Sequence, residues 1–395
     1  MLEIIFWILF VVVAYTFAGY AFLLWIMLFF KNTFFGKKTR ILPPYTSLPE
    51  VCLFVTAYNE SDYVEAKVKN MLSLDYPPDK IQYLWITDGS DDGTPEKLGQ
   101  FPQMEVHHLP QRNGKIHAMN RGMKFVKAPL VIFSDSNTIL CREAISVMVQ
   151  TFQDPGVGCI AGEKRIVNNK LDSAAGSGEN LYWKFESWVK RMDSELNSTV
   201  GAVGELFAIR THLYMEVEND TILDDFIISL RIAEKGYQIA YTPQAYAIET
   251  ASANVSEELK RKVRIAAGGL QTIVRLKELL NPFRFGWLSV QYISHKVLRW
   301  TIAPIALFGL FAVNLIILLK GQDAQAALFY HVFFYLQAFM YLLAVLGWLL
   351  ERWKIRFKIL FVPFYFTAMN YAAIRGWLRF LKGRQSVRWE KSKRA

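Results

Sequence analysis

The chain has strongly apolar ends and a mixed middle region. Residues 4–30 carry no charged side chain, and two further apolar stretches span residues 300–319 and 327–350. At about 1.5 Å per residue, a helix over the first stretch reaches roughly 40 Å, more than the ~30 Å hydrocarbon core of a bilayer. We therefore predict one membrane-spanning helix near the N-terminus and two near the C-terminus.

The first stretch does not fit a cleaved signal peptide, which has a basic start, a shorter apolar core and a small-residue cleavage site. Glu3 lies at its start, and the basic residues follow it. These residues are Lys31, Lys37, Lys38 and Arg40. Because Lys and Arg concentrate on the cytosolic side of a span, we expect the chain after residue 30 to lie in the cytosol.

A weaker apolar stretch, residues 359–381, contains Pro363 and Arg375. A charge inside a span is costly, and a full crossing would put the basic tail on the outer side, against the positive-inside tendency. The tail carries Arg384, Arg388, Lys391, Lys393 and Arg394. We predict either a further span or a broken, re-entrant or interfacial segment.

Residues 281–294 combine aromatic side chains with few charges. The aromatic residues are Phe283, Phe285, Trp287 and Tyr292. An ordinary surface helix can show this pattern, but aromatic side chains also favour the headgroup level of a bilayer. Because an apolar stretch follows directly, we interpret the segment as amphipathic and interfacial.

Short β-forming runs and helical patterns occupy the middle region. The runs 51–56, 83–87 and 130–134 lack clean alternation, which is typical of strands buried on both faces. Helical patterns follow these runs or lie between them, at residues 63–74, 116–126 and 143–152. Such a succession predicts an α/β domain with a mostly parallel sheet.

The formal net charge is +10. The basic clusters flank the apolar stretches, which favours anionic lipids as partners. The sequence has no zinc-finger or RNA-binding signature, so we expect no nucleic-acid partner. Its cysteines, Cys52, Cys141 and Cys159, have neither zinc-site nor disulfide spacing and are predicted to be reduced core residues.

A polar or acidic cluster follows each predicted strand. The clusters occupy residues 56–60, 88–94 and 135–138. Each cluster alone is weak evidence: the Asp and Gly residues of 88–93 also suit a simple turn, and residues 88–99 lack the final Glu of an EF-hand. Ligands bind open α/β sheets at the carboxyl ends of the strands, however, so the three clusters together predict one site.

Lys115 and the pair Asp224 and Asp225 stand at the starts of helical patterns. A lysine at a helix start can bind phosphate, although most such lysines are solvated, and the P-loop consensus is absent. Acidic residues are common at helix starts because the helix dipole favours them. These residues indicate a functional site only when they are considered together with the three clusters.

Together, the motifs resemble the family-2 glycosyltransferases, which include cellulose, chitin, hyaluronan and poly-N-acetylglucosamine synthases. The matching stretches, in family order, are 56–60, 88–94, 114–120, 134–138, 204–210 and 224–237. His295–Lys296 and residues 387–391 also resemble the membrane members. The resemblance implies a GT-A nucleotide-sugar-binding domain flanked by transmembrane helices.

The resemblance further implies a role for each matching residue. Asp225 matches the catalytic base. Asp135 and Asn137 match the Asp-x-Asp motif, which would hold Mg²⁺ or Mn²⁺ on the donor diphosphate, here with an amide in place of the second carboxylate. The implied donor-binding residues are Tyr58, Glu60, Asp88, Lys115 and Asp135. The implied acceptor-binding residues are Gly204, Glu205, Arg210, Asp224 and Arg264.

One motif departs from the family pattern. Polymerising members carry Gln-x-x-Arg-Trp before the later spans, where this chain has residues 261–265. Arg264 keeps the arginine, but Ile265 replaces the aromatic platform for a sugar ring. This departure argues against processive polymerisation.

The resulting division comprises an anchor (1–30), a cytosolic catalytic domain (31–280), an interfacial segment (281–299), a C-terminal region of two to three spans (300–381) and a basic cytosolic tail (382–395). The expected function is inverting transfer from a UDP-sugar to a saccharide or lipid-linked acceptor at a bacterial inner membrane, in envelope polysaccharide or glycolipid synthesis. Open alternatives are a single transfer to a polyprenyl-phosphate or other lipid, an inactive sugar-nucleotide sensor, and a structural membrane protein whose acidic clusters are turns.

Overall fold

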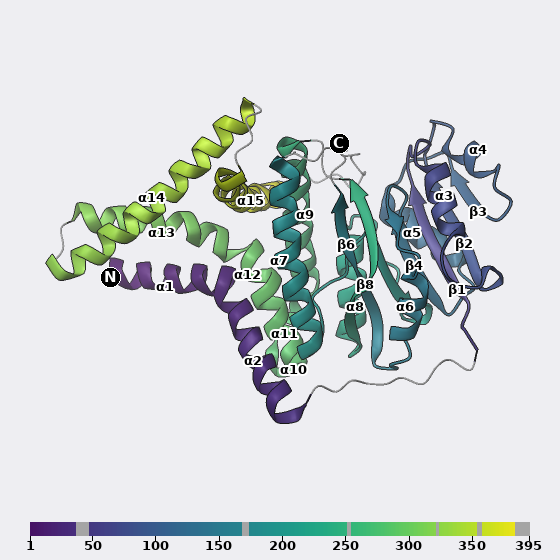
Figure 1. Cartoon of the computed structure of the whole chain (residues 1–395), viewed down its shortest axis with the longest axis horizontal. Coiled ribbons are helices and arrows are strands. Elements are labelled where there is room, and N and C mark those ends of the chain that lie inside the picture. The colour runs from purple at the N-terminus through teal and green to yellow at the C-terminus, as the bar shows by residue number, and fades with distance from the viewer. Residues whose placement is uncertain (37–46, 168–173, 251–253, 321–323, 354–357, 384–395) are drawn as a thin grey trace.

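A computed structural model describes residues 1–36, 47–167, 174–250, 254–320, 324–353 and 358–383. The basic positions 37, 38 and 40, the tail arginines and lysines from residue 384 onward, and the motif at 387–391 lie outside the described residues. Figure 1 shows a sheet-based domain on the right, long helices on the left, and α7 and α9 between them.

The domain is built on a mixed sheet of eight strands, with the order β3-β2-β1-β4-β7-β6-β8-β5. The strands are β1 (Val51–Ala57), β2 (Ile81–Asp88), β3 (Glu105–Leu109), β4 (Leu130–Asp135), β5 (Ile139–Leu140), β6 (Val157–Val167), β7 (Leu206–Arg210) and β8 (Gln238–Thr250). The half formed by β3, β2, β1 and β4 is parallel, as is the β6–β8 pair. β7 runs antiparallel to β4 and β6, and β5 to β8. The expected parallel sheet is therefore correct for the half with the polar clusters, and the other half is mixed.

The three strands and three helices predicted in the first half are confirmed. The helices there are α3 (Val64–Leu72), α4 (Thr94–Leu98), α5 (Lys115–Gly122) and α6 (Ala144–Thr151). Alternate residues of β1 enter separate cores: Leu53 and Val55 pack with α3 and α6, whereas Cys52 and Phe54 pack with α5. This two-sided burial explains why the strand reads as a continuous apolar run.

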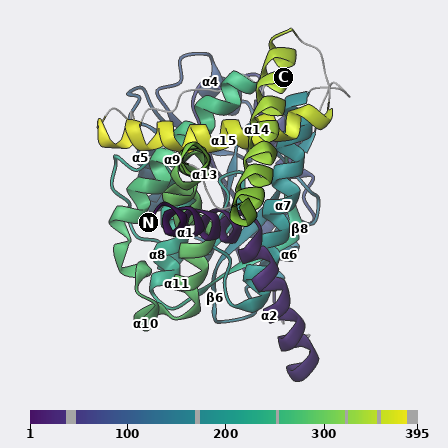
Figure 2. The same ribbon diagram turned by 90° about the vertical axis from the view of Figure 1, so that its left-hand side faces the viewer.

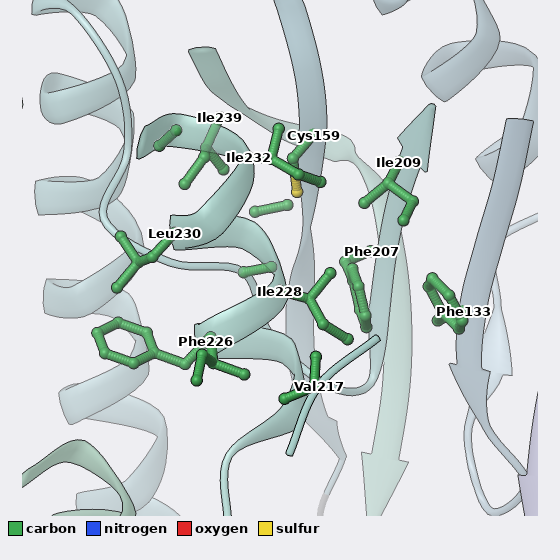
Figure 3. Packing of buried hydrophobic residues seen from close by; sticks show 14 of the residues in the cluster. Phe133, Cys159, Phe207, Ile209, Val217, Phe226, Ile228, Leu230, Ile232 and Ile239 are labelled. Atoms are coloured by element: carbon green, nitrogen blue, oxygen red, sulfur yellow. The ribbon is translucent and has the colours of Figure 1, made fainter. Parts of the chain in front are cut away.

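Three longer helices follow, namely α7 (Ala174–Leu196), α8 (Asp224–Glu234) and α9 (Val255–Arg275). Ile228 and Ile232 of α8 point toward Phe207 and Cys159 of the sheet (Figure 3). Phe226 points to the opposite side, where its ring lies 5.1 Å from the Trp300 ring. The start of α8 therefore packs between the sheet and the segment around Trp300 that precedes the apolar helix 302–319.

Three helices of the described chain are long and apolar enough to cross a membrane: Leu2–Phe35, Ile302–Leu319 and Leu328–Glu351. The elements that form this region are α1 (Leu2–Ala14), η1 (Tyr15–Gly19), α2 (Tyr20–Phe35), α13 (Ile302–Leu319), α14 (Ala324–Arg352) and α15 (Lys358–Leu381). The π-helical turn η1 coincides with the bend between α1 and α2 in Figure 1.

Helix α15 runs across the direction of α1 and α13. It is seen end-on in Figure 1, whereas in Figure 2 it lies across the view and α1 and α13 are seen end-on. It packs closely on α9, since a Cβ added to Gly376 would lie 2.5 Å from that of Ala266. Its orientation therefore differs from that of the apolar helices α1 and α13.

The segment before α13 is amphipathic. It comprises α10 (Pro282–Phe285), α11 (Trp287–Tyr292), η6 (Ile293–Val297) and α12 (Leu298–Trp300). Phe283 is fully exposed and Trp287 half exposed, whereas Leu288 and Tyr292 are buried in the core of the sheet domain. One face of the segment therefore packs on the sheet domain, and the other face is exposed. The remaining helical turns are η2 (Pro78–Lys80), η3 (Met123–Phe125), η4 (Thr211–Leu213) and η5 (Lys277–Leu280).

Candidate active site

The polar clusters meet at one edge of the parallel half of the sheet. Thr56 at the end of β1 pairs in register with Ile86 of β2 on one side and with Asp135 of β4 on the other. Asp88 ends β2 two residues after Ile86. The three clusters are thus adjacent, as their positions after parallel strands predict.

Asp88 is buried and fixes the loop before α5. Its Oδ2 accepts hydrogen bonds from the backbone N–H groups of Asn113 (3.0 Å) and Gly114 (2.6 Å). Its Oδ1 is buried without a hydrogen-bond partner among the described residues. Asp88 and Tyr58 also line a small pocket in which the guanidinium of Arg112 lies 3.8 Å from the centre of the Tyr58 ring.

Glu60 lies at the end of the first cluster, two residues after Tyr58. Its side chain is buried, and its backbone N–H donates to Oγ1 of Thr94 (3.0 Å). Together with Asp88 and Tyr58, it gives this edge of the sheet an acidic and aromatic character suited to hydroxyl groups and a flat ring.

Lys115, the first residue of α5, joins two acidic groups. Its Nζ lies 2.9 Å from Oδ1 of Asp135 and 3.1 Å from Oδ2 of Asp224. Burial disfavours the charged ammonium, but the nearby carboxylates outweigh burial and raise the pKa of Lys115. Burial conversely raises the pKa of Asp135, against the effect of Lys115. Lys115 therefore remains a cation that faces acidic groups.

Asp225 lies in the first turn of α8, beside Gly204. A Cβ built on Gly204 would lie 3.7 Å from Oδ2 of Asp225 and 3.6 Å from Nζ of Lys115. Burial, and then the negative charge of Asp224, raise the pKa of Asp225 to about 7, although Lys115 opposes them. A carboxylate with such a pKa is suited to take up a proton near neutral pH.

The loop after β4 offers two side-chain oxygens to a cation. Asp135 presents its carboxylate, and Oδ1 of Asn137 is buried without a hydrogen-bond partner among the described residues. In that part of the chain, no three His, Cys, Asp or Glu residues form a complete metal cage. Mg²⁺ sites, however, often use one or two protein carboxylates plus substrate phosphates. The donor set therefore fits a metal that binds together with a diphosphate.

A cavity of about 650 Å³ extends from this site toward the apolar helices. Asp135, Gly204, Glu205 and Asp225 line one part of it. Most of its other lining residues are apolar, and many of them come from α7, α9, α12, α15 and the turn η1. The cavity therefore joins the candidate base to the membrane-side helices.

Three of the five residues expected at the acceptor, Gly204, Glu205 and Asp224, lie near Asp225. Gly204 and Glu205 line the cavity, and Asp224 contacts Lys115. Glu205 also forms an ion pair with the buried Lys164, which is shared with Glu249. Burial opposes ionisation of Glu205, but Lys164 outweighs it and lowers the pKa of Glu205.

The other two residues, Arg210 and Arg264, are not brought to the site. Arg210 pairs in register with Leu130, at the opposite end of β4 from Asp135. Its guanidinium donates hydrogen bonds to the backbone carbonyls of residues 152, 154 and 157. Arg264 does not line the cavity, whereas Arg261, Lys262 and Ile265 of the same helix do.

The sequence reasoning missed a group of cavity-lining residues on α7 and near α12. The group comprises Tyr182, Trp183, Glu186, Lys190 and Arg299. Tyr182, Glu186 and Lys190 are spaced four residues apart, and this spacing alone would have predicted one helix face. What that face contacts depends on how α7 docks in the fold.

Comparison with known proteins gives relatives of two kinds. The chain is 28% identical over 237 residues to poly-beta-1,6-N-acetyl-D-glucosamine synthase of Staphylococcus aureus, and 27% identical over 257 residues to the Staphylococcus epidermidis synthase of the same name. These matches cover 58% and 62% of this chain, and 56% and 61% of the relatives, so the chain spans little more than half of the curated relatives it matches.

A solved structure shares the whole fold. It is the mannosyltransferase PcManGT from Pyrobaculum calidifontis in complex with GDP-Man and Mn²⁺, with a TM-score of 0.69 and 22% identity, over 98% of this chain and 100% of that one. The fold is thus that of a GT-A glycosyltransferase with attached apolar helices. Residues 49–268, more than half of the sequence, match the family described as "Glycosyltransferase like family 2", and the chain belongs to this family of glycosyltransferases.

Proposed function

We propose that this glycosyltransferase transfers a sugar from a UDP-sugar, with inversion, to a lipid-linked acceptor that reaches Asp225 from the membrane side. The observation that carries the proposal is the cavity of about 650 Å³ that joins Asp225 to α15 and η1. Its lining is mostly apolar, as expected of a path for a ligand with a hydrocarbon part.

The donor is proposed to bind across the ends of β1, β2 and β4. Tyr58, Glu60 and Asp88 would hold the nucleoside. Lys115 would face the diphosphate, since a lysine at a helix start suits phosphate binding. Asp135 and Asn137 would hold Mg²⁺ or Mn²⁺ there, and the metal would supply charge stabilisation for the leaving diphosphate. The solved mannosyltransferase with GDP-Man and Mn²⁺ supports a metal-bound nucleotide sugar as donor.

Asp225 is proposed to act as the base. An acceptor hydroxyl beside Gly204 would give its proton to the Asp225 carboxylate as its oxygen bonds to the anomeric carbon. The bond from that carbon to the diphosphate breaks on the opposite face, so an α-linked donor gives a β-linked product. The raised pKa of Asp225 supports this role, because a base with a pKa near the working pH is an effective proton acceptor.

A saccharide acceptor is the second candidate, and the names of the staphylococcal relatives favour it. Ile265 favours the lipid-linked acceptor, because it lines the cavity where polymerising members of the family carry a tryptophan. Gly204, Glu205 and Asp224 would contact either acceptor near its reacting hydroxyl.

The proposed location is a bacterial inner membrane, with the sheet domain in the cytosol. The helices 2–35, 302–319 and 328–351 would span the bilayer. Because α15 runs across α1 and α13, we expect it to lie along the membrane surface, and this orientation supports the interfacial alternative for the segment. The exposed Phe283 and Trp287 would sit at the headgroup level.

The test is a screen of radiolabelled UDP- and GDP-sugars with membranes that contain the protein, with Asp225→Asn as control. We expect one lipid-extractable product, and an Asp225→Asn variant that binds donor but transfers little. A ladder of water-soluble saccharides would support the saccharide acceptor instead. Donor binding without release of nucleotide would indicate a sensor, and no nucleotide binding at all would overturn the proposal.

A further inference from the structure

The membrane side of the large cavity contains cationic and N–H groups that lack matching acceptors. Lys190 of α7 is the clearest case: it is 4% exposed and lines the cavity. Among the described residues its ammonium forms no hydrogen bond or salt bridge, although the buried carboxylate of Glu163 is near enough to interact with it electrostatically. Because burial without a hydrogen-bond acceptor disfavours a charged group, this ammonium is well placed to bind an anion that enters the cavity.

A second unmatched donor lies beside Lys190. The indole Nε1 of Trp183 is buried without a hydrogen-bond partner among the described residues, and Trp183 also lines the cavity. Nζ of Lys190 lies 5.9 Å from the centre of the Trp183 ring, and Nζ of Lys262 lies 5.5 Å from it. This part of the wall therefore presents donors and positive charge.

The cavity-lining part of the neighbouring ion cluster also carries more cations than carboxylates. Arg299 contacts Glu186 at 2.8 Å, and Lys296 donates a hydrogen bond to the same carboxylate. Both cations line the cavity together with Lys190. On this part of the cavity wall, three cations thus face the single carboxylate of Glu186. The carboxylates of Glu163 and Asp193, which interact with Lys190 and His295, do not line the cavity.

The surroundings of these groups indicate what carries the anion. The same cavity is lined by Phe17, Val362, Phe366 and Met369, from η1 and α15. Asp225 lines the cavity as well. A ligand that matches the apolar wall, the cationic groups and the candidate base has a hydrocarbon chain, a phosphate and a hydroxyl-bearing sugar.

We propose that Lys190, Trp183 and Arg299, together with Lys296, form a subsite for the phosphate of a phosphate-linked acceptor lipid. The inference rests on the proposed function and adds to it the anionic group of the acceptor. The hydrocarbon chain lies along α15 and Phe17, the phosphate meets Lys190, and the sugar hydroxyl faces Asp225. The subsite recognises the acceptor and takes no part in the bond-forming step.

The experiment measures equilibrium binding to the full chain in a neutral detergent. The probes are farnesyl phosphate, uncharged farnesol, and UDP with Mn²⁺. We expect Lys190→Met to weaken farnesyl phosphate binding at least about tenfold, the usual effect of losing a charge-assisted hydrogen bond. Binding of farnesol and UDP should stay unchanged, because neither probe contacts Lys190.

Two further variants provide controls. Lys184→Met removes an exposed lysine from the same helix and should leave farnesyl phosphate binding unchanged. Lys190→Arg keeps the charge and should retain most of the binding, which separates loss of the anion contact from misfolding. Trp183→Phe keeps an aromatic ring but removes the N–H donor, so it should weaken the phosphate probe more than farnesol.

Each contrary outcome is distinct. The subsite is overturned if the unaltered protein binds farnesyl phosphate no more tightly than farnesol. It is equally overturned if Lys190→Met weakens the binding of UDP as much as that of farnesyl phosphate, since Lys190 would then bind the diphosphate of the donor. If membranes that contain the protein transfer labelled sugar to a lipid but Lys190→Met leaves farnesyl phosphate binding unchanged, the subsite is wrong and the proposed function stands. If Lys190→Met weakens farnesyl phosphate binding but no labelled sugar is transferred to a lipid, the subsite stands and the proposed function is wrong.

Discussion

Lys115 and Asp135 form an ion pair of 2.9 Å at the junction of the proposed donor site and the cavity. The two residues proposed to serve the diphosphate and the metal thus neutralise each other before either ligand arrives. A bound metal diphosphate would exchange this contact for one of Lys115 with phosphate and one of Asp135 with metal. The pair therefore helps to fix the positions of both side chains.

Replacing Lys115 with Met should weaken donor binding at least about tenfold, because a charge-assisted contact to phosphate is lost and the carboxylates of Asp135, Asp224 and Asp225 lose their shared cation. Titration of UDP in the presence of Mn²⁺ measures the effect. Lys124→Met, at an exposed lysine just after α5, is the control and should bind UDP normally. Equal UDP affinity in both variants would exclude Lys115 from the donor site.

Gly204→Ala should lower turnover at least about tenfold with little change in stability. The added methyl group meets Asp225 and Lys115 at ordinary contact distances of 3.6–3.7 Å, so the fold tolerates it. It nevertheless occupies the space in which an acceptor hydroxyl must approach Asp225. A variant with normal transfer would show that acceptors approach by another route.

Gly201→Ala is the matched contrast in the same loop. Gly201 has a φ of +81°, and an added Cβ would lie 2.2 Å from the ring of Phe226. We expect a loss of stability of about 1–3 kcal/mol, seen as a lower unfolding temperature. If Gly201→Ala unfolds like the unaltered protein, the loop is less constrained than the structure indicates.

Lys67→Met should raise the Mn²⁺ concentration that gives half-maximal transfer. The buried Nζ of Lys67 donates hydrogen bonds to Oγ of Ser134 (2.7 Å) and to the carbonyl of Thr138 (2.8 Å), so it ties down both ends of the loop that carries Asp135 and Asn137. Loss of these contacts loosens the proposed metal ligands. Lys69→Met, at an exposed lysine of the same helix, should leave the Mn²⁺ dependence unchanged, and equal shifts in both variants would contradict this role.

The donor edge was predictable from sequence because it depends on local patterns. The strands β1, β2 and β4 are short apolar runs, and each ends at a polar cluster. Parallel strands place such ends at the same edge of the sheet whatever the order of the strands. The place of Asp88 and Asp135 at one edge therefore follows from the sequence, whereas the order β2-β1-β4 that brings them close is seen only in the structure.

The acceptor side was less predictable because it depends on strand direction and helix rotation. β7 is antiparallel to β4, and five residues at about 3.3 Å each carry Arg210 roughly 15 Å from the Gly204 end. Arg264 shares a motif with residues that line the cavity, but the way α9 docks puts other residues on its wall. Lys190 has no motif, and only packing of α7 against α12 and α15 gives it a role.

The pH dependence of transfer tests Asp225 as the base. Burial and the charge of Asp224 raise its pKa to about 7, so the carboxyl is protonated and inactive below that pH. We expect kcat/KM of the free enzyme to rise about tenfold per pH unit up to roughly pH 7 and then to level off. Asp224→Asn removes a negative neighbour, which makes ionisation of Asp225 easier, so the acid limb should move to lower pH. Glu65→Gln, at an exposed residue of α3, should leave the limb in place. A limb that stays fixed in Asp224→Asn would assign the titration to another group.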